Sequence, residues 1–183
     1  MTSSIRLLTA SDAEAYFEHL SRHMGESGRD GDFIFTPSDG YDRLNKPKEL
    51  ERFREKWELS LDEPGWTRTW GVFVNGDIRG HIDLRGGYLK TSLHRASLAM
   101  GLERPLRKQG LGAKLIELAL QWLRETPSLE WVDLYVFANN HPAQRLYSRF
   151  GFRETGRVAD LFRIHGEPIT DIHMVLKLDT DAT

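Results

Sequence analysis

The sequence contains no cysteine, no long apolar run and almost no excess of charge of either sign. Without cysteine the chain forms no disulfide and has no thiolate chemistry, which excludes covalent catalysis through that residue. The segment from Met1 to Ser11 lacks the basic and then apolar pattern of a signal peptide, and no segment reads as a membrane span. The formal net charge of −2 gives no electrostatic case for nucleic acid or anionic membrane. We therefore expect a cytoplasmic protein without nucleic-acid or membrane partners.

The length and composition fit one ordinary globular domain. At 183 residues the chain can bury a core without disulfides or structural metals, and its 39% apolar and 28% charged residues are typical of such proteins. We find no internal repeat. The sequence predicts a single domain over residues 1–183, with its core between residues 5 and 178.

A basic turn that contains two glycines joins a predicted strand to a predicted helix. The strand is the apolar run Ala96 to Leu102, and the helix, Leu111 to Glu125, has leucines at helical spacing. Between them the chain reads RxxGxGA, from Arg107 to Ala113. Glycines let the backbone turn tightly or merely redirect it, and the free amides at a helix N-terminus bind anions. The turn is therefore a candidate phosphate site.

Two other phosphate-binding patterns fail at this turn. A Walker A loop needs GxxxxGK[ST], and no glycine stands five residues before a Gly-Lys pair. A dinucleotide fingerprint starting at Gly110 would need a third small residue where the chain has Leu115.

A second motif follows about thirty residues later. Trp131 to Phe137 reads as a strand, and the next segment, from Asn140 to Phe152, reads NxxAxxLYxxxGF. Asn140 is suited to cap the helix and Pro142 to open it, while Gly151 is suited to end it. The two motifs together resemble those of the GNAT superfamily of N-acetyltransferases, which bind acetyl-coenzyme A.

The remaining elements agree with that resemblance. We expect a strand at residues 5–8, a helix after Thr9, a helix at 47–61, a hairpin of residues 69–74 and 78–84 turning at Asn75-Gly76, and two last strands at 153–162 and 169–178. The predicted class is α/β of the α+β type. It is a mixed, mostly antiparallel sheet of about seven strands with helices on both faces. The resemblance adds a splay between the fourth and fifth strands.

The resemblance also implies the residues that bind acetyl-CoA, the expected co-substrate, without a metal. The backbone of the turn would hold the pyrophosphate, and main-chain groups of the fourth strand would contact the pantetheine arm. The implied cofactor-binding residues are Met100, Leu102, Arg107, Lys108, Gln109, Gly110, Leu111, Gly112, Ala113, Lys114, Asn140, Ala143 and Tyr147. Asn140 has an alternative role as a helix cap.

Three catalytic roles follow from the same resemblance. Tyr147 occupies the position of the general acid that protonates the thiolate of coenzyme A, although a tyrosine on the apolar face of a helix can equally be core packing. An amide near Leu102 would act as the oxyanion donor. Glu103 is a candidate general base, or else a solvated strand-end charge that pairs with Arg104 or Arg107. His81, Asp83 and His94 are further candidate bases.

Two further features can be explained either by a functional site or by an ordinary protein surface. His19 and His23 have the i, i+4 spacing of metal ligands, but no third ligand accompanies them, so a solvated helical face is the better interpretation. The segment 25–46 contains Glu26, Asp30, Asp32, Asp39 and Asp42 among aromatic residues. We interpret it as a candidate lid over an amine-bearing acceptor, or alternatively as an ordinary acidic surface loop.

The sequence thus predicts an N-acetyltransferase that transfers acetyl directly from the thioester to a primary amine. The amine could belong to a small molecule or to a protein. The alternative is a non-catalytic acyl-CoA-binding or sensing module, which would keep the turn but need no catalytic acid. Members of the family often form homodimers through their last strands, so a homodimer is among the expected assemblies.

Overall fold

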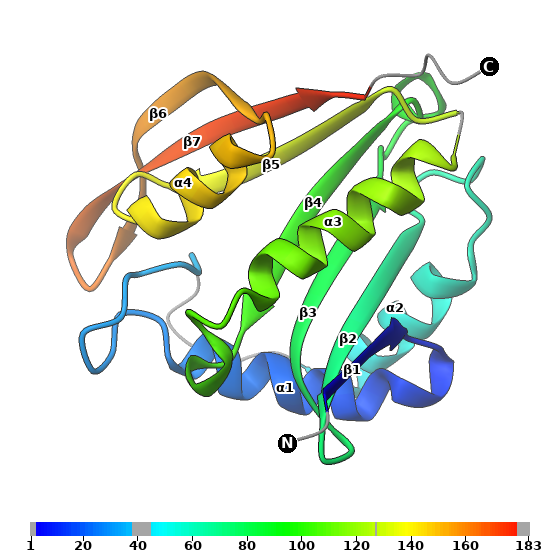
Figure 1. The fold of residues 1–183 in the computed structure, drawn as a ribbon, viewed down its shortest axis with the longest axis horizontal. Helices are drawn as coiled ribbons and strands as arrows, with labels where there is room; N and C mark the ends of the chain where they lie inside the picture. The colour runs from blue at the N-terminus through cyan, green and yellow to red at the C-terminus, as the bar shows by residue number, and fades with distance from the viewer. Residues whose placement is uncertain (1–2, 38–44, 127, 179–183) are drawn as a thin grey trace.

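The computed structural model describes residues 3–37, 45–126 and 128–178, which form a seven-stranded sheet with helices around it (Figure 1). The strand order is β1-β2-β3-β4-β5-β7-β6. The strands are β1 (Ser3–Leu7), β2 (Thr67–Val74), β3 (Asp77–Gly86), β4 (Arg95–Leu102), β5 (Trp131–Phe137), β6 (Arg153–Ile164) and β7 (Glu167–Lys177). The helices are α1 (Ala13–Gly25), α2 (Lys46–Glu58), α3 (Leu111–Arg124) and α4 (His141–Arg149), with short 3-10 turns η1 (Ala10–Asp12), η3 (Lys90–Ser92) and η4 (Arg104–Leu106).

The sheet confirms the predicted fold class. All neighbouring strands pair antiparallel except β4 and β5, which are parallel. The β2–β3 hairpin turns at Asn75 and Gly76, whose φ angles of 52° and 91° are those that a two-residue turn requires. Helix α2 ends earlier than predicted because Leu59 leaves helical geometry, with φ −58° and ψ 141°. No helix in the described ranges is long and apolar enough to cross a membrane.

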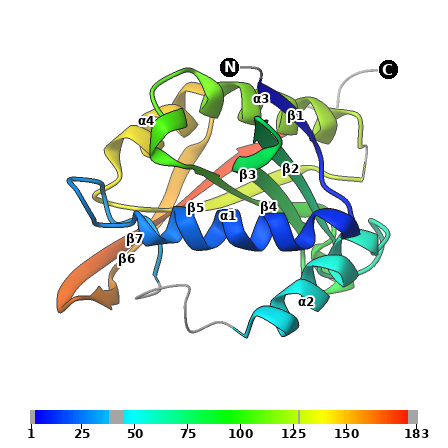
Figure 2. The same ribbon diagram turned by 90° about the horizontal axis from the view of Figure 1, so that it is seen from below.

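The helices cover both faces of the sheet, as Figures 1 and 2 show from two directions. Helices α3 and α4 pack on one face, where Leu115 and Tyr147 join a core with Ile82 and Leu134. Helices α1 and α2 cover the other face, where Tyr16 and Phe53 join a smaller cluster. Successive residues of a strand point to opposite faces, so the central part of β3 is buried on both sides.

Strands β4 and β5 stay paired over only part of their length. The parallel register joins Arg95 to Trp131 and ends where Ser97 meets Asp133. Beyond that point β4 remains paired with β3 as far as Leu102, and β5 with β7 as far as Phe137. The two halves of the sheet therefore diverge, which is the splay that the resemblance implied.

Substitution of adjacent residues on β5 tests this layering. Leu134 is 1% exposed in the core beneath α3 and α4, whereas Tyr135 is 64% exposed on the opposite face. We expect Leu134→Ala to lower the free energy of unfolding by about 2–5 kcal/mol, because it leaves a cavity. Tyr135→Ala should cost less than about 1 kcal/mol. Urea unfolding measures both, and equal losses would contradict the assignment of faces.

Candidate functional site

The open part of β4 directs main-chain groups into the splay. The Glu103 N–H donates to the Arg79 carbonyl at 3.0 Å on the β3 side, and the His94 carbonyl accepts from the Trp131 N–H at 3.2 Å on the β5 side. Main-chain groups alternate between the two sides of a strand. The amides of Met100 and Leu102 therefore point toward β5, beyond the last paired residues.

The basic turn brings the N-terminus of α3 beside this opening. Gly110 precedes the helix with a left-handed φ of 78°, and the first helical bond runs from the Lys114 N–H to the Gly110 carbonyl at 3.2 Å. The amides of residues 111–113 thus have no partner one turn earlier in the helix. Gly112 lies against β4 and α4, since a Cβ there would be 3.6 Å from Met100 Cε and 3.1 Å from Leu146 Cδ2. Strand and helix together present a row of amides that are free of partners among the described residues.

Helix α4 supplies the other wall on the same face. The Asn140 carbonyl oxygen accepts from the Ala143 N–H at 3.3 Å, so Asn140 does cap the helix. Tyr147 is buried against Phe152, and burial raises its pKa to about 12. Its phenol is therefore neutral at pH 7, which a proton donor requires. Within the described residues its hydroxyl has no hydrogen-bond partner.

Two arginines of the turn region are bound to the acidic segment after α1. Arg107 donates to the Leu102 carbonyl at 2.8 Å and to Asp32 at 2.7 Å, and it also pairs with Glu26. Arg104 contacts Asp30 at 3.0 Å and Asp32 at 2.9 Å. In this structure the carboxylates that were predicted to attract an ammonium group thus neutralise cations of the same chain. The pyrophosphate role predicted for Arg107 stays a prediction.

The segment after α1 also crosses toward α4 and the β6–β7 hairpin, as both ribbon views show. Phe33 lies 6.5 Å from the ring of His141 at the start of α4. Ile34 packs with Phe137 and Phe162. Residues 25–37 therefore reach from α1 to the start of α4 and to β6. The lid role stays a prediction, and Asp39 and Asp42 of the predicted lid fall outside the described residues.

Glu103 lies at the end of β4 but is not the solvated charge that one interpretation predicted. It is 4% exposed, and it accepts from His19 at 2.9 Å, Arg22 at 3.0 Å and Arg79 at 3.1 Å rather than from Arg104 or Arg107. Burial opposes its ionisation, but the hydrogen bonds from His19 and Arg79 prevail and hold its pKa below the ordinary value. A carboxylate with three donors is a poor acceptor for a further proton.

The prediction that His19 and His23 lie on a solvated helical face is wrong. His19 is fully buried and His23 is 8% exposed, and both rings pack between α1 and the sheet. His23 and His81 sit directly over Gly101, where a Cβ would lie 2.5 Å from His23 Nε2 and 2.6 Å from His81 Cε1. The sequence did contain a signal, because each histidine follows an apolar-face residue, Tyr16 or Leu20, by three positions.

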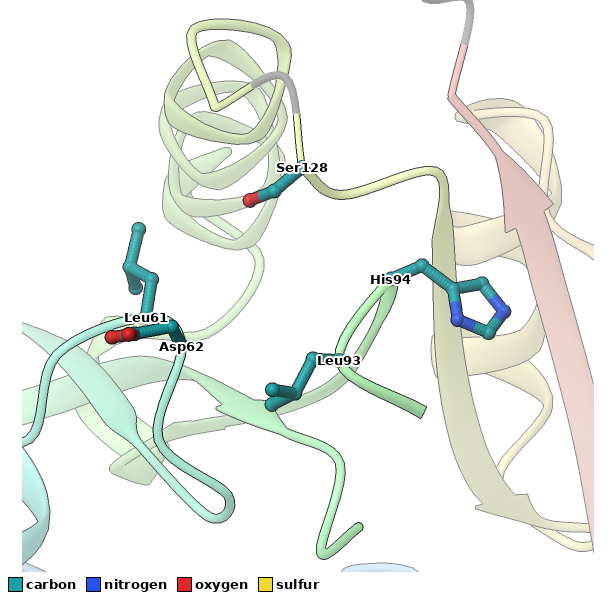
Figure 3. Close-up of a pocket in the computed structure, with 5 residues that line it drawn as sticks. All are labelled: Leu61, Asp62, Leu93, His94 and Ser128. Atoms are coloured by element: carbon teal, nitrogen blue, oxygen red, sulfur yellow. The ribbon is translucent and has the colours of Figure 1, made fainter. Parts of the chain in front are cut away.

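His94, another predicted base, lies far from these groups. It precedes β4 and lines a cavity of about 370 Å³ with Leu61, Asp62, Leu93 and Ser128 (Figure 3). At about 3.3 Å per residue, the length of β4 separates it from Leu102 by about 26 Å. The structure therefore brings His81 and Asp83 toward the open part of β4, but not His94.

Comparison with known proteins agrees with this geometry. Residues 34–152 match the family described as the acetyltransferase (GNAT) family. The chain belongs to that family. The L-amino acid N-acetyltransferase AaaT of Escherichia coli is 25% identical over 123 residues, which cover 64% of this chain and 73% of the relative.

Solved structures of acetyltransferases superpose on nearly the whole chain. A GNAT-family acetyltransferase from Streptococcus pneumoniae has a TM-score of 0.82 and 25% identity, over 97% of this chain and 100% of that one. The yncA protein of Salmonella typhimurium, solved with its cofactor acetyl-CoA, has a TM-score of 0.80 and 17% identity, over 100% and 98%. At that identity, the second likeness concerns the fold alone.

The buried histidine His23 makes a prediction about stability. Burial, with His19 and Arg107 nearby, lowers its pKa to about 3, whereas an unfolded histidine titrates near ~6.5. Between these values the unfolded chain binds more protons than the folded protein, so stability falls as the pH drops through that window. We expect His23→Gln to flatten this dependence by up to about 1.4 kcal/mol per pH unit.

Urea unfolding at pH 7, 6 and 5 measures the effect. The exposed His94 provides a control, because His94→Gln should leave the pH dependence as it is in the wild type. An unchanged slope in His23→Gln would contradict the assignment of a buried, neutral ring.

Proposed function

We propose that this chain transfers the acetyl group of acetyl-CoA directly to the nitrogen of a primary amine. The observation that carries the proposal is the row of free amides formed by Met100, Leu102 and the first turn of α3. This row runs from a helix N-terminus, which favours an anion, to a strand edge, which favours an amide-bearing chain. A pyrophosphate joined to a pantetheine arm has that order of groups.

The chain's own groups have distinct tasks in this proposal. When bound, acetyl-CoA supplies an acetyl group activated as a thioester. The amides of residues 111–113, which are free of helical partners, bind the pyrophosphate, and Lys108 adds positive charge. Arg107 would add charge only after leaving Glu26 and Asp32. The amide of Met100 orients the arm, and that of Leu102 donates to the carbonyl oxygen as negative charge develops there. Asn140 and Ala143 border the arm at the start of α4.

Tyr147 is the proposed general acid. Its phenol is buried in the core between the sheet and helices α3 and α4, and it stays protonated at neutral pH because burial raises its pKa. A neutral O–H can protonate the departing thiolate, whereas an ionised one cannot. The packing against Phe152 fixes the ring, so core packing and catalysis are compatible roles for this residue.

The acceptor class is the least constrained part of the proposal. The E. coli relative is named as an L-amino acid N-acetyltransferase, so free amino acids head the candidates. Spermidine and a short peptide with a free N-terminus represent the polyamine and protein alternatives. The non-catalytic alternative has no observation in its favour.

Thiol release by the purified protein tests the function. We expect acetyl-CoA, but neither NAD nor ATP, to bind in calorimetry and to release free thiol with at least one amine of this panel. Gly112→Glu should abolish binding, because it places a bulky carboxylate among the amides of the helix start. Gly156→Glu adds the same side chain at an open position on β6 and should bind normally. Binding by Gly112→Glu, or no thiol release by the wild type, would contradict the proposal.

A second substitution separates the acid from the binding site. We expect Tyr147→Phe to lower kcat by about 10²-fold, because the thiolate then departs unprotonated, while the Kd of acetyl-CoA changes little. Tyr135→Phe removes a hydroxyl from the opposite face of the sheet and serves as the matched control. If turnover of Tyr147→Phe equals that of the control, the tyrosine is core packing only.

A further inference from the structure

Four buried side chains form a continuous line beneath α1, from β4 to β3. Glu103 Oε1 lies 2.9 Å from His19 Nδ1, His19 Nε2 lies 2.9 Å from His81 Nδ1, and His81 Nε2 lies 3.5 Å from Asp83 Oδ1. None of the four is more than 6% exposed. The line therefore has a carboxylate at each end and two imidazoles between them.

Each carboxylate at the ends of the line pairs with arginine. Arg22 and Arg79 contact Glu103 at 3.0 and 3.1 Å. Arg85 pairs with Asp83, and the Tyr16 hydroxyl donates to Asp83 at 3.2 Å. Among the described residues, His23 also neighbours the line and stacks on His19 with ring centroids 5.8 Å apart. Carboxylates paired in this way act as acceptors, so every proton in the three gaps comes from the imidazoles.

A count of these protons shows a vacancy. Two neutral imidazoles carry one N–H each, so they fill two of the three gaps. A carboxylate oxygen can only accept, so the His19 nitrogen that faces Glu103, Nδ1, carries the proton of that ring. His19 Nε2 is then an acceptor, so the proton of His81 lies on its Nδ1 and is directed at His19 Nε2. His81 Nε2 is then left with a lone pair facing Asp83 Oδ1. That gap is the long one, at 3.5 Å.

The vacant gap lies close to the open part of β4. His81 pairs across the sheet with Gly101, and Asp83 pairs with Ala99. Cross-strand neighbours have Cβ atoms about 5 Å apart. The β4 residues on this face, Ser97, Ala99 and Gly101, are small, and the first two remain at least partly exposed. An amine that reaches the splay over Ala99 would therefore meet the gap between His81 and Asp83.

We propose that His81 and His19 form a relay that takes one proton from the acceptor ammonium at the gap between His81 Nε2 and Asp83 Oδ1. This inference rests on the proposed acetyl transfer. The ammonium N–H bond breaks as His81 Nε2–H forms, while the proton on His81 Nδ1 moves to His19 Nε2. His19 ends as the cation beside Glu103, all three gaps are filled, and the amine keeps its lone pair for attack. The proton later leaves by the reverse route toward Asp83, which lines a cavity of about 150 Å³.

The two imidazoles have different tasks in the relay. Burial and the neighbouring His19 hold the pKa of His81 well below its ordinary value, so a charge would not stay on that ring. Passing the second proton to His19 moves the charge next to a carboxylate. In these terms His81 is a catalytic residue, and His19, Asp83 and Glu103 are positioning residues. Glu103 thereby acts on the amine's proton without being its acceptor.

The pH dependence of kcat/KM tests the relay, with the best amine of the panel as substrate. We expect His81→Gln to lower kcat/KM at pH 7 by about 10²-fold, and the loss to shrink as rising pH deprotonates the amine in solution. Asp83→Asn should lower kcat/KM with the same pH dependence, because the amide N–H of the asparagine would donate to His81 Nε2 and leave no site there for the proton of the amine. His94→Gln should follow the wild type. A loss that is independent of pH, or no loss, would overturn the relay.

Nitrogen-15 NMR of the histidine rings gives a readout that needs no turnover. In the wild type at pH 8 we expect His81 to carry its proton on Nδ1 and none on Nε2, with Nε2 protonated as the pH falls. A proton on Nε2 throughout pH 6–9 would overturn the relay. If the wild type binds acetyl-CoA but acetylates no amine, the proposed function fails. If it turns over and His81→Gln keeps the wild-type pH profile, only the relay fails.

Discussion

The divergence of β4 from β5 is the constraint on which the rest of the structure depends. A strand within a sheet normally has main-chain partners on both sides, but β4 loses one of its neighbours after Ser97. Its free amides must then find partners outside the sheet. The glycine-containing turn that follows β4 brings the start of α3 to the same place, so a second set of free amides lies next to the first. Coenzyme A is long enough to contact both sets of amides, and neither set alone would bind its whole length.

The opposite face of β4 has a different chemistry. Gly101 leaves room for two imidazoles where any larger residue would collide with them. Arginines pair with Glu103 and Asp83 in this buried region, and the two carboxylates contact the histidines in turn. The amides thus lie on one side of the splay and a titratable network on the other. An acyl donor and an amine could approach the same strand from opposite faces.

The sequence predicted the strands, turns and amides around the splay better than the buried network of histidines and carboxylates. Strand periodicity, the Asn75-Gly76 turn and the glycines around α3 are local signals, and each appears in the structure as expected. The contacts of Glu103 are long-range, since His19 and Arg79 lie far from it in the sequence. No local pattern distinguishes such a carboxylate from a solvated one. The polarity of His19 and His23 predicts a solvated face, whereas their positions three residues after Tyr16 and Leu20 place them on the apolar face of α1.

Hydrogen–deuterium exchange, measured with and without acetyl-CoA, tests the central claim most directly. The two sets of amides belong to different elements, β4 and α3, yet a single ligand should cover both. Acetyl-CoA is predicted to slow exchange at Met100 and Leu102 and at residues 111–113, and to leave the β2–β3 hairpin turn at Asn75 and Gly76 unchanged. Protection of the helix start without β4, or of neither, would contradict the account.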